Sequence, residues 1–384
     1  MITVIVFLLV LSVLVLVHEL GHFSVARRFG IKVEEFGLGF PPRAVGWYKN
    51  KFGKRIKVSG TRNFSSLEED EDEKLQPKKD ATIYSLNWLP LGGFVKIKGE
   101  NGDDRNDPDS FGAKPIYQRA LVLVAGVAMN IVLAWFLFSL GYMIGLPQTT
   151  DELGKRARIS EQAVLVADVL ADSPAALAGL EAGDKILAVE GLEVKTESGL
   201  QEIIGARAEM ETEILINRNG EEKIIIATPE KSGERAVVGI SIFSAGKISY
   251  PFFSALTEGA KTTAWTLKAI VLAFVGLFRD MFSGVAVGDQ FAGPIGIANI
   301  TGQAARMGFV YLLQFTALLS LNLAVLNILP FPALDGGRLI FLLAEKIKGR
   351  PVKKVIENLM NNIGFLLLIL LIIFITIKDV IKLF

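Results

Sequence analysis

The sequence predicts a polytopic α-helical membrane protein with four transmembrane helices, a membrane-associated β-hairpin region and one small soluble domain of strands and short helices. Three observations lead to this prediction. Hydrophobic residues make up 51% of the 384 residues. The mean hydropathy is +0.43, which is well above that of soluble globular chains. Long uncharged stretches alternate with segments rich in charge.

Four stretches are long enough to cross the hydrocarbon core, which needs about 20 mostly apolar residues per helix. The first span is expected within residues 1–30, and it has neither the basic start nor the small-residue cleavage site of a signal peptide. The other spans are expected at 120–146, 307–337 and 358–378. A further apolar stretch, 269–278, is too short to cross, so an interfacial or packed amphipathic helix is expected there.

Basic residues near the span ends predict the orientation in the membrane. They follow the first span, precede the second, and fill the stretch between the third and the fourth. We therefore expect a cytoplasmic-side membrane-associated loop and β-hairpin at 31–119 and a cytoplasmic loop at 338–357. Both chain ends, the soluble domain and a linker at 247–306 are then expected outside the cytoplasm.

Composition excludes several classes of chemistry. The formal net charge is +1, so no strong field indicates a nucleic-acid partner. The chain has no cysteine, which excludes disulfides, thiolate metal sites and a cysteine nucleophile. The only two histidines, His18 and His22, lie in the first predicted span.

These histidines belong to the stretch "HELGH", which fits H-E-x-x-H. On a helix, residues i and i+4 share one face, so His18 and His22 can bind one metal ion. Glu19 is offset from that face but stays close enough to exchange protons beside the ion. Zn²⁺ is the expected ion, at one per chain, because it accepts tetrahedral nitrogen and oxygen ligands. A simpler interpretation is that the three polar groups only extend toward the water interface.

A catalytic zinc site of this type needs a third protein ligand, and without another histidine or a cysteine it must be a carboxylate. Asp335 is the best candidate, because Pro330, Pro332 and Gly336-Gly337 surround it with broken backbone, which is tolerated at membrane depth where it lines a cavity. The other carboxylates considered lie outside the spans: Glu258, Asp280, Asp289 and Asp379.

The soluble domain is expected at residues 160–246. It contains a first strand, "AVLVADVL", a hairpin around Asn219-Gly220 and a closing strand, "VVGISI". The segment from Ser173-Pro174 to Gly183-Asp184 resembles the core of a bacterial PDZ domain. This resemblance implies a groove between the strand at 164–170 and the helix at 198–206, where a peptide or protein C-terminus adds a strand to the sheet.

Taken together, "HELGH" and the stretch from Asn327 to Gly336 resemble the site-2 protease family. The single extracytoplasmic PDZ domain is similar to the bacterial regulator-of-sigma-factor branch of these intramembrane zinc metalloproteases. The resemblance extends to further segments: Gly37-Leu38-Gly39-Phe40, residues 89–100, Gly126 with Asn130, and residues 293–298.

The resemblance implies hydrolysis of a peptide bond within the transmembrane segment of a single-span protein, such as an anti-sigma factor or a signal-peptide remnant. His18, His22 and Asp335 would hold the metal, and Glu19 would act as general base and then general acid. Asn327 would contact substrate, although an interhelical hydrogen bond fits it nearly as well. An edge strand at Gly92-Gly93 would hold the substrate extended. The expected location is the bacterial cytoplasmic (inner) membrane, in contact with membrane lipid.

Two alternatives stay open at this stage. A catalytically silent, membrane-anchored PDZ scaffold would keep a relict metal site, but it would be expected to lack Glu19 or a metal ligand. A metal transporter would be expected to carry several ionisable groups across the second to fourth spans, and those spans are almost free of charge.

Overall fold

The structure is a computed structural model, and it describes residues 2–60, 62, 64–100, 105–149, 156–218, 220–232, 235–283 and 293–381. The chain forms two compact units: the first comprises residues 1–138 and 259–384, and the second comprises residues 139–258. Each is described by itself. Asp289 and Asn219 lie outside the described residues.

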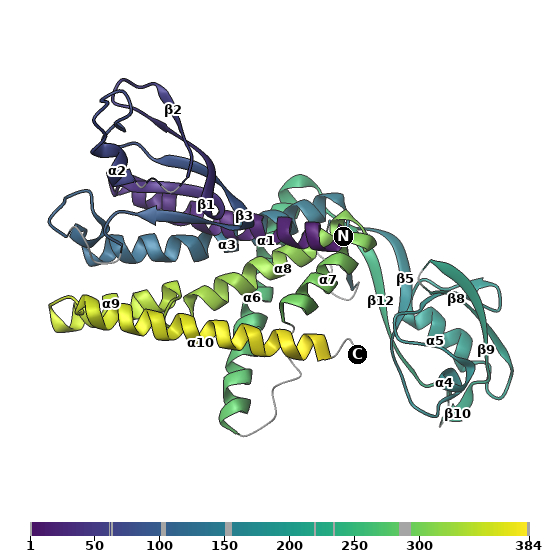
Figure 1. The fold of residues 1–384 in the computed structure, drawn as a ribbon. Helices are drawn as coiled ribbons and strands as arrows, with labels where there is room; N and C mark the ends of the chain where they lie inside the picture. Colours follow the sequence, from purple (N-terminus) through teal and green to yellow (C-terminus); the bar gives the residue numbers. More distant parts are fainter. Residues whose placement is uncertain are drawn as a thin grey trace. The chain divides into compact units, whose positions relative to one another are not determined.

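The first unit is built from long apolar helices and one small sheet (Figure 1). Its elements are α1 (Ile2–Arg28), β1 (Val33–Lys49), β2 (Arg55–Val58), α2 (Phe64–Glu68), β3 (Ile83–Ile97), η1 (Phe111–Ala113), α3 (Ile116–Ile144), α6 (Phe252–Phe282), α7 (Pro294–Met307), α8 (Phe309–Ile328), α9 (Asp335–Lys348) and α10 (Lys354–Ile381). The end of α3 and the start of α6 belong to the second unit.

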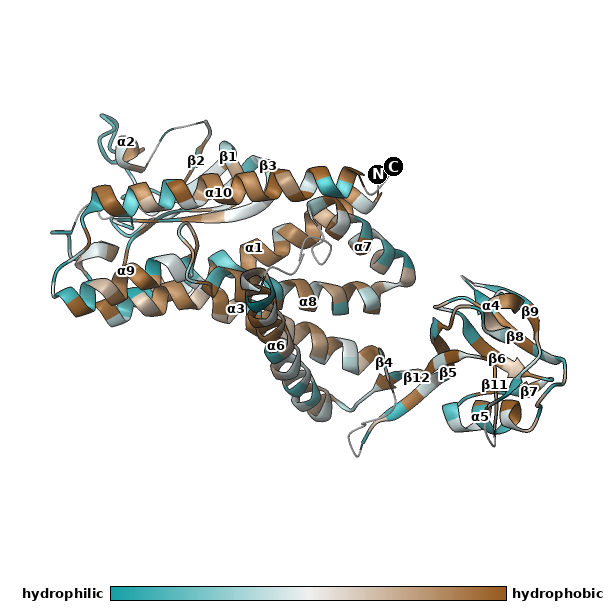
Figure 2. Ribbon diagram, turned by 90° about the horizontal axis from the view of Figure 1, so that it is seen from below, coloured by the Kyte–Doolittle hydropathy of each residue, from teal (hydrophilic) through white to brown (hydrophobic). Residues whose placement is uncertain are grey.

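Five of the described helices are long and apolar enough to cross a membrane: α1, α3, α6, α8 and α10. The strongly hydrophobic colouring of α1 and α10 is seen in Figure 2. Four of the five helices match the predicted spans, so the count of four depends on how α6 meets the membrane.

Two predicted boundaries are wrong. The stretch 269–278 is only the C-terminal part of α6, which continues back to Phe252 through a polar segment that periodicity in a short window misses. The predicted third span, 307–337, is divided: α8 ends at Ile328, the chain turns around Pro330 and Pro332, and Asp335 begins α9. The proline pair cannot continue a helix and therefore separates the two.

In the sheet of the first unit, β1 and β3 are both bent, and they pair with each other along two separate stretches. Phe36 lies opposite both Val95 and Tyr84, so the first half of β1 runs between the two arms of β3. The second half of β1 pairs with β2 and with the earlier arm of β3. Residues 93–97 are therefore the edge of this sheet, with β1 as their only strand partner in the described structure.

The second unit is a β-sheet domain with two short helices. Its elements are β4 (Leu146–Thr149), β5 (Arg158–Val169), α4 (Pro174–Ala178), β6 (Lys185–Val189), β7 (Leu192–Glu193), α5 (Glu197–Gly205), β8 (Thr212–Arg218), β9 (Glu221–Ala227), β10 (Glu230–Ser232), β11 (Arg235–Val237) and β12 (Ile240–Ser249). The main sheet has the order β4-β12-β5-β6-β8-β9. Buried aliphatic residues such as Val164, Ile186, Leu200 and Ile214 form its core.

The predicted groove of this domain lies beside a different strand. β5 is internal, between β12 and β6, so it has no free edge for a peptide. A cavity of about 530 Å³ instead adjoins α5 and the start of β12, and Asp168 of β5 and Leu170, just after β5, also line it. β4 pairs only with residues 245–248 of β12, which leaves residues 240–244 facing α5. The sequence pattern could not show which of the two paired strands keeps a free edge.

A buried ion pair stabilises the turn after α4. Arg218 Nε and Nη2 donate to the two Asp184 carboxylate oxygens, each at 2.7 Å, and Arg218 Nη2 also donates to the Gly179 carbonyl. The Asp184 side chain is 1% exposed. Burial by itself raises the pKa of Asp184, but the hydrogen bonds from Arg218 and the Glu181 amide outweigh it, so the pKa lies below its ordinary value.

We predict that Arg218→Met lowers the local unfolding free energy of residues 156–249 by about 3 kcal/mol, because Asp184 keeps its burial and loses its partner. Hydrogen–deuterium exchange of the full chain measures this. The folded pKa of Asp184 is depressed, so the ionised Asp184 side chain stabilises the folded domain above about pH 4, and this stabilisation decreases as the pH falls below that value.

In Arg218→Met this dependence of stability on acid pH should weaken. Arg207→Met is the control, because Arg207 pairs with Glu190 near the surface. Equal losses in both variants would contradict the prediction.

Candidate metal centre and active site

The structure brings His18, His22 and Asp335 together, although 317 positions in the sequence separate the first from the last. Asp335 Oδ2 lies 3.0 Å from His18 Nε2 and 3.3 Å from His22 Nε2. The two Nε2 atoms are 3.1 Å apart. Among the described residues, these three form the one cluster of histidine and acidic side chains with metal-binding spacing, and both histidines are buried.

Contacts to α3 orient the two imidazole rings. His22 Nδ1 is 2.8 Å from the carbonyl oxygen of Val122, so it carries the proton and leaves Nε2 free to bind a metal. The side-chain amide of Asn130 lies 3.3 Å from His18 Nδ1, and its Oδ1 is buried without a hydrogen-bond partner. An amide turned so that Oδ1 accepts from His18 Nδ1–H would prepare Nε2 of that ring in the same way.

Glycines allow α1, α3 and the turn before α9 to meet at backbone distance. A Cβ added to Gly21 would lie 2.3 Å from the carbonyl oxygen of Ala125. One added to Gly126 would lie 2.5 Å from His22 Nε2. Cβ atoms at Gly336 and Gly337 would strike the carbonyl oxygens of Leu329 and Phe331, at 2.1 and 2.3 Å. The metal ligands can therefore converge only where these positions lack a side chain.

The turn that presents Asp335 is strained and tied to its neighbours. Ala333 has a φ of +73°, a region that residues with a Cβ rarely adopt. Its amide nitrogen is 3.3 Å from Oδ1 of Asn361 on α10. Pro332 packs against Gly364, where any Cβ would come within 2.5 Å of the Pro332 carbonyl oxygen. Contacts with α10 thus hold the turn in the backbone conformation that directs Asp335 toward the histidines.

Two ion pairs fix α9, one of them largely buried, and sequence reasoning did not identify them. Arg119 of α3 donates to both carboxylate oxygens of Glu345, at 3.0 and 2.6 Å. Arg338, one turn after Asp335, forms an ion pair with Glu100, which follows β3. The sequence shows charged residues on a short amphipathic helix, which indicates that they could form ion pairs. It does not identify their partners, which lie more than 200 positions away. Orienting α9 fixes the position of Asp335 at its start.

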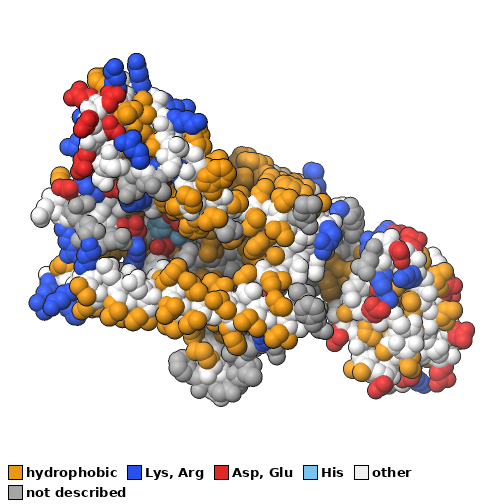
Figure 3. Space-filling view, viewed as in Figure 1, with side chains coloured by type: hydrophobic (Ala, Val, Ile, Leu, Met, Phe, Trp, Pro, Cys, Tyr) orange, Lys and Arg blue, Asp and Glu red, His pale blue; other side chains and the backbone are white. Residues whose placement is uncertain are grey.

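A cavity of about 430 Å³ opens onto the cluster. It is lined by the three candidate ligands and by Val15, Glu19, Phe40, Gly93, Phe94, Val95, Glu100, Leu323, Asn327, Ala333, Leu334 and Arg338. Figure 3 shows histidine and acidic side chains at the bottom of a hollow. Glu19 of α1 and Val95 of β3 both line this cavity. The catalytic candidate and the edge of the sheet therefore share one cavity.

The remaining predicted residues lie at or beside this cavity. Asn327 Nδ2 is 3.5 Å from His18 Nε2. Gly93 lines the cavity, and a Cβ there would lie 2.9 Å from the Gly37 carbonyl oxygen. Gly92 instead packs on Val15 of α1 with a φ of +73°. The alternative carboxylate Asp379 accepts hydrogen bonds from the amides of Gly293 and Gly296, so it caps α7 and takes no part in the cluster.

Comparisons with known proteins show the family to which the chain belongs. The chain matches the model of peptidase family M50 over residues 6–79 and 72–371. It is 30% identical to the regulator of sigma-W protease RasP of Bacillus subtilis over 100% of this chain and 99% of that protein. It is 29% identical to the zinc metalloprotease RasP of Bacillus licheniformis, with the same coverage. The PDZ domain of an SdrC-like protein from Listeria monocytogenes covers 22% of this chain at 20% identity, with a TM-score of only 0.21.

We predict that Gly126→Ala lowers zinc affinity by about tenfold or more, because the new methyl group occupies the space of the His22 and His18 ring atoms. Zinc per chain, measured after dialysis of the full-length protein against a weak chelator, checks this. Gly276→Ala is the matched control, since a Cβ at that helical position meets no atom within 4 Å. Retention of wild-type zinc by Gly126→Ala would show that the cluster does not bind the metal.

Proposed function

Because the chain belongs to peptidase family M50, we propose that it hydrolyses peptide bonds within the transmembrane segments of single-span membrane proteins. The chain is a zinc metalloprotease, as the family and its relatives indicate. The observation that supports the finer proposal is the position of the site: His18, His22 and Asp335 meet among helices that are apolar enough to cross a membrane. Unpaired ionisable groups are costly in such surroundings.

The three ligands fit a zinc ion by their chemistry. Two imidazole nitrogens and one carboxylate oxygen are the donor set of a catalytic zinc site that keeps an open position. His22 Nδ1 is already bound to a carbonyl oxygen, as metal-binding histidines usually are. When bound, Zn²⁺ would polarise the carbonyl of the scissile bond and favour ionisation of a water molecule.

Glu19 is the proposed general base and general acid. It follows His18 on α1 and lines the cavity together with the three ligands. The Glu19 carboxylate accepts a proton from the attacking water as the new C–O bond forms. It then donates this proton to the leaving amine as the C–N bond breaks, so one water is consumed and two chain ends are produced.

The edge of the sheet is proposed to hold the substrate extended. Residues 93–97 have an open side beside the cavity, where a peptide could add as a further strand. Ser12 Oγ donates to the Pro90 carbonyl oxygen and ties the preceding turn to α1. Gly92 and Gly93 let this turn lie close to α1. Asn327, on the other side of the cavity, would donate its amide to the substrate carbonyl oxygen.

We further infer that four helices complete a crossing and that α6 does not. Tyr250, just before α6, donates its amide to the Tyr142 carbonyl oxygen near the end of α3. After α6, Gly293 bonds to Asp379 near the end of α10, and Gly302 of α7 packs on Thr3 near the start of α1. Because α1 and α3 pack antiparallel, with His22 beside Val122 and His18 beside Asn130, we infer that these connections lie on one side of the membrane.

The length of the connection supports this inference. If α6 crossed, residues 283–292 would have to return through a core about 30 Å thick, whereas ten helical residues span only about 15 Å. Extended backbone cannot make this passage in lipid. With the positive-inside rule, both chain ends and the second unit are extracytoplasmic, and the protein lies in the bacterial cytoplasmic (inner) membrane.

The second unit is proposed to be a PDZ domain that binds a peptide or protein C-terminus. The cavity beside α5 is lined by residues 240–242 of β12, which are proposed to be open to strand addition. The name of the Bacillus subtilis relative, regulator of sigma-W protease, supports an anti-sigma factor as one class of substrate. Signal-peptide remnants are the second class we propose.

We predict that Glu19→Gln keeps its zinc but cleaves a single-span model substrate about 10²- to 10⁴-fold more slowly than wild type. Full-length protein in detergent is compared by product formation on gels, with zinc content measured on each sample. Glu69→Gln, an exposed substitution of the same chemistry, should cleave at the wild-type rate.

Other outcomes separate the alternatives. Wild-type rates in Glu19→Gln would show that another group transfers the proton. If the wild type binds zinc and cleaves nothing, even after deletion of residues 160–246 to remove a possible filter, the catalytically silent scaffold replaces the protease.

A further inference from the structure

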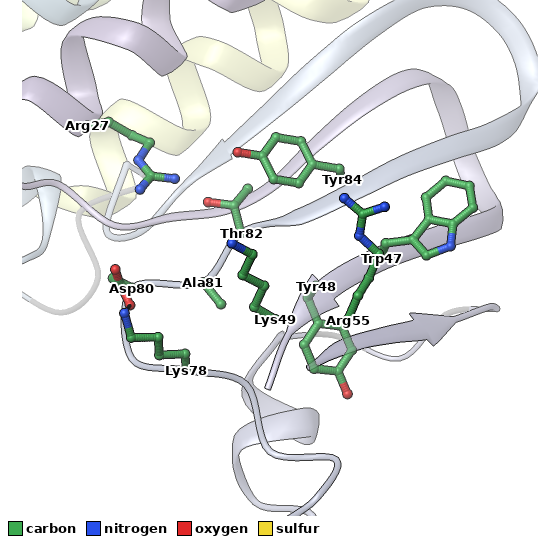
Figure 4. A pocket seen from close by; sticks show the side chains of 10 residues that line it. All are labelled: Arg27, Trp47, Tyr48, Lys49, Arg55, Lys78, Asp80, Ala81, Thr82 and Tyr84. Carbon is green, nitrogen blue, oxygen red and sulfur yellow. Dashed lines mark ion pairs between the residues drawn. The ribbon is translucent and has the colours of Figure 1, made fainter. Parts of the chain in front are cut away.

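A second cavity lies where the sheet of the first unit meets the end of α1, and no step of the proposed reaction uses it. Its volume is about 410 Å³. Figure 4 shows the ten side chains around it, with Arg27 from α1 on one side and Trp47 and Arg55 from the sheet on the other. Four of the ten are basic: Arg27, Lys49, Arg55 and Lys78.

The positive charge of this cavity is not balanced. Asp80 is the only acidic side chain in its lining, and it pairs with Lys78 at 3.3 Å. Within the described part of the chain, Arg27, Lys49 and Arg55 form no ion pair within 4.0 Å; Arg27 lies over the Phe23 ring and feels the charge of Asp80 from a longer distance. Four cations thus surround an open volume that holds one carboxylate. Such an arrangement favours an anion with several acceptor oxygens.

The rim of the cavity is aromatic and continues into an exposed apolar stripe. Trp47 and Tyr84 are direct partners across β1 and β3, and their exposed fractions are 39% and 47%. Along β3, Leu86 and Trp88 follow on the same face as Tyr84 and are also exposed, whereas Ile83, Ser85 and Asn87 are buried. Exposing a row of apolar side chains to water is unfavourable, so this face of the strand is expected to contact lipid or another apolar surface.

These features place the cavity at the membrane surface. Arg27 lies in the last turn of α1, where this span leaves the hydrocarbon core. Aromatic and basic side chains together are typical of that level. A ligand there would meet cations at the cavity and apolar side chains along the stripe formed by Tyr84, Leu86 and Trp88.

We propose that this cavity binds the phosphate of an anionic phospholipid, with an acyl chain lying along the stripe. Arg27, Lys49 and Arg55 donate to the phosphate oxygens, and Trp47 and Tyr84 cover the glycerol region. β3 also carries residues 93–97, so a lipid bound at one arm holds the sheet whose other arm borders the catalytic cavity. The proposal stands on this surface alone and does not depend on catalysis.

The test measures lipid retained by the full-length protein in neutral detergent, by native mass spectrometry. Phosphatidylglycerol and phosphatidylcholine with identical acyl chains are compared, and inorganic phosphate is added as a competitor. The variant Lys49→Gln/Arg55→Gln removes two of the cations. The control, Lys54→Gln/Lys57→Gln, removes the same charge from neighbouring residues that do not line the cavity.

Phosphatidylglycerol should bind in preference to phosphatidylcholine, and Lys49→Gln/Arg55→Gln should weaken it about tenfold or more, while the control stays near wild type. Arg27→Gln should also weaken phosphatidylglycerol binding. Because Arg27 lies on α1, a loss in this variant cannot come from misfolding of the sheet. Displacement of the lipid by millimolar inorganic phosphate would reassign the cavity to a free anion. Equal weakening in variant and control, or equal retention of both lipids, would overturn the proposal.

Discussion

The structure depends on a close approach of backbones inside an apolar bundle. Three side chains can meet at one ion only if α1, α3 and the turn before α9 come nearer than ordinary side chains allow. Gly21, Gly126, Gly336 and Gly337 provide that distance, since any Cβ there would fall within 2.1 to 2.5 Å of a neighbouring atom. In lipid, helix association depends on such packing, because the hydrocarbon supplies no hydrophobic driving force between helices.

The same setting requires that polar groups be held by other polar groups. Each imidazole contacts α3, through the Val122 carbonyl or the Asn130 amide, and Ser320 of α8 donates to the Asn130 carbonyl oxygen. Ion pairs fix α9 from two directions, toward α3 and toward the end of β3. These contacts avoid the cost of unpaired polar groups in a low-dielectric interior, and they give the site one geometry.

The small sheet joins two environments. One arm of β3 borders the catalytic cavity with an open strand edge, and the other arm exposes an apolar face beside a group of cations. Because β1 pairs with both arms, main-chain hydrogen bonds connect a displacement of one arm to the position of the other. The proposed anchoring at the membrane surface and the proposed positioning of an extended substrate would thus use one sheet.

The membrane class, the four main apolar helices, the proposed zinc ligand types and the proposed role of Glu19 follow from the sequence alone, because hydropathy and helical spacing are local properties. Because the chain has no other histidine and no cysteine, the third ligand must be a carboxylate. The prolines and glycines around Asp335 indicate this residue. Four features appear only in the folded chain: the separation of α8 from α9, the open edge of β12, the ion pairs of Arg119 and Arg338, and the group of basic side chains around the cavity at the end of α1. These depend on pairings between residues distant in the chain, which no local pattern encodes.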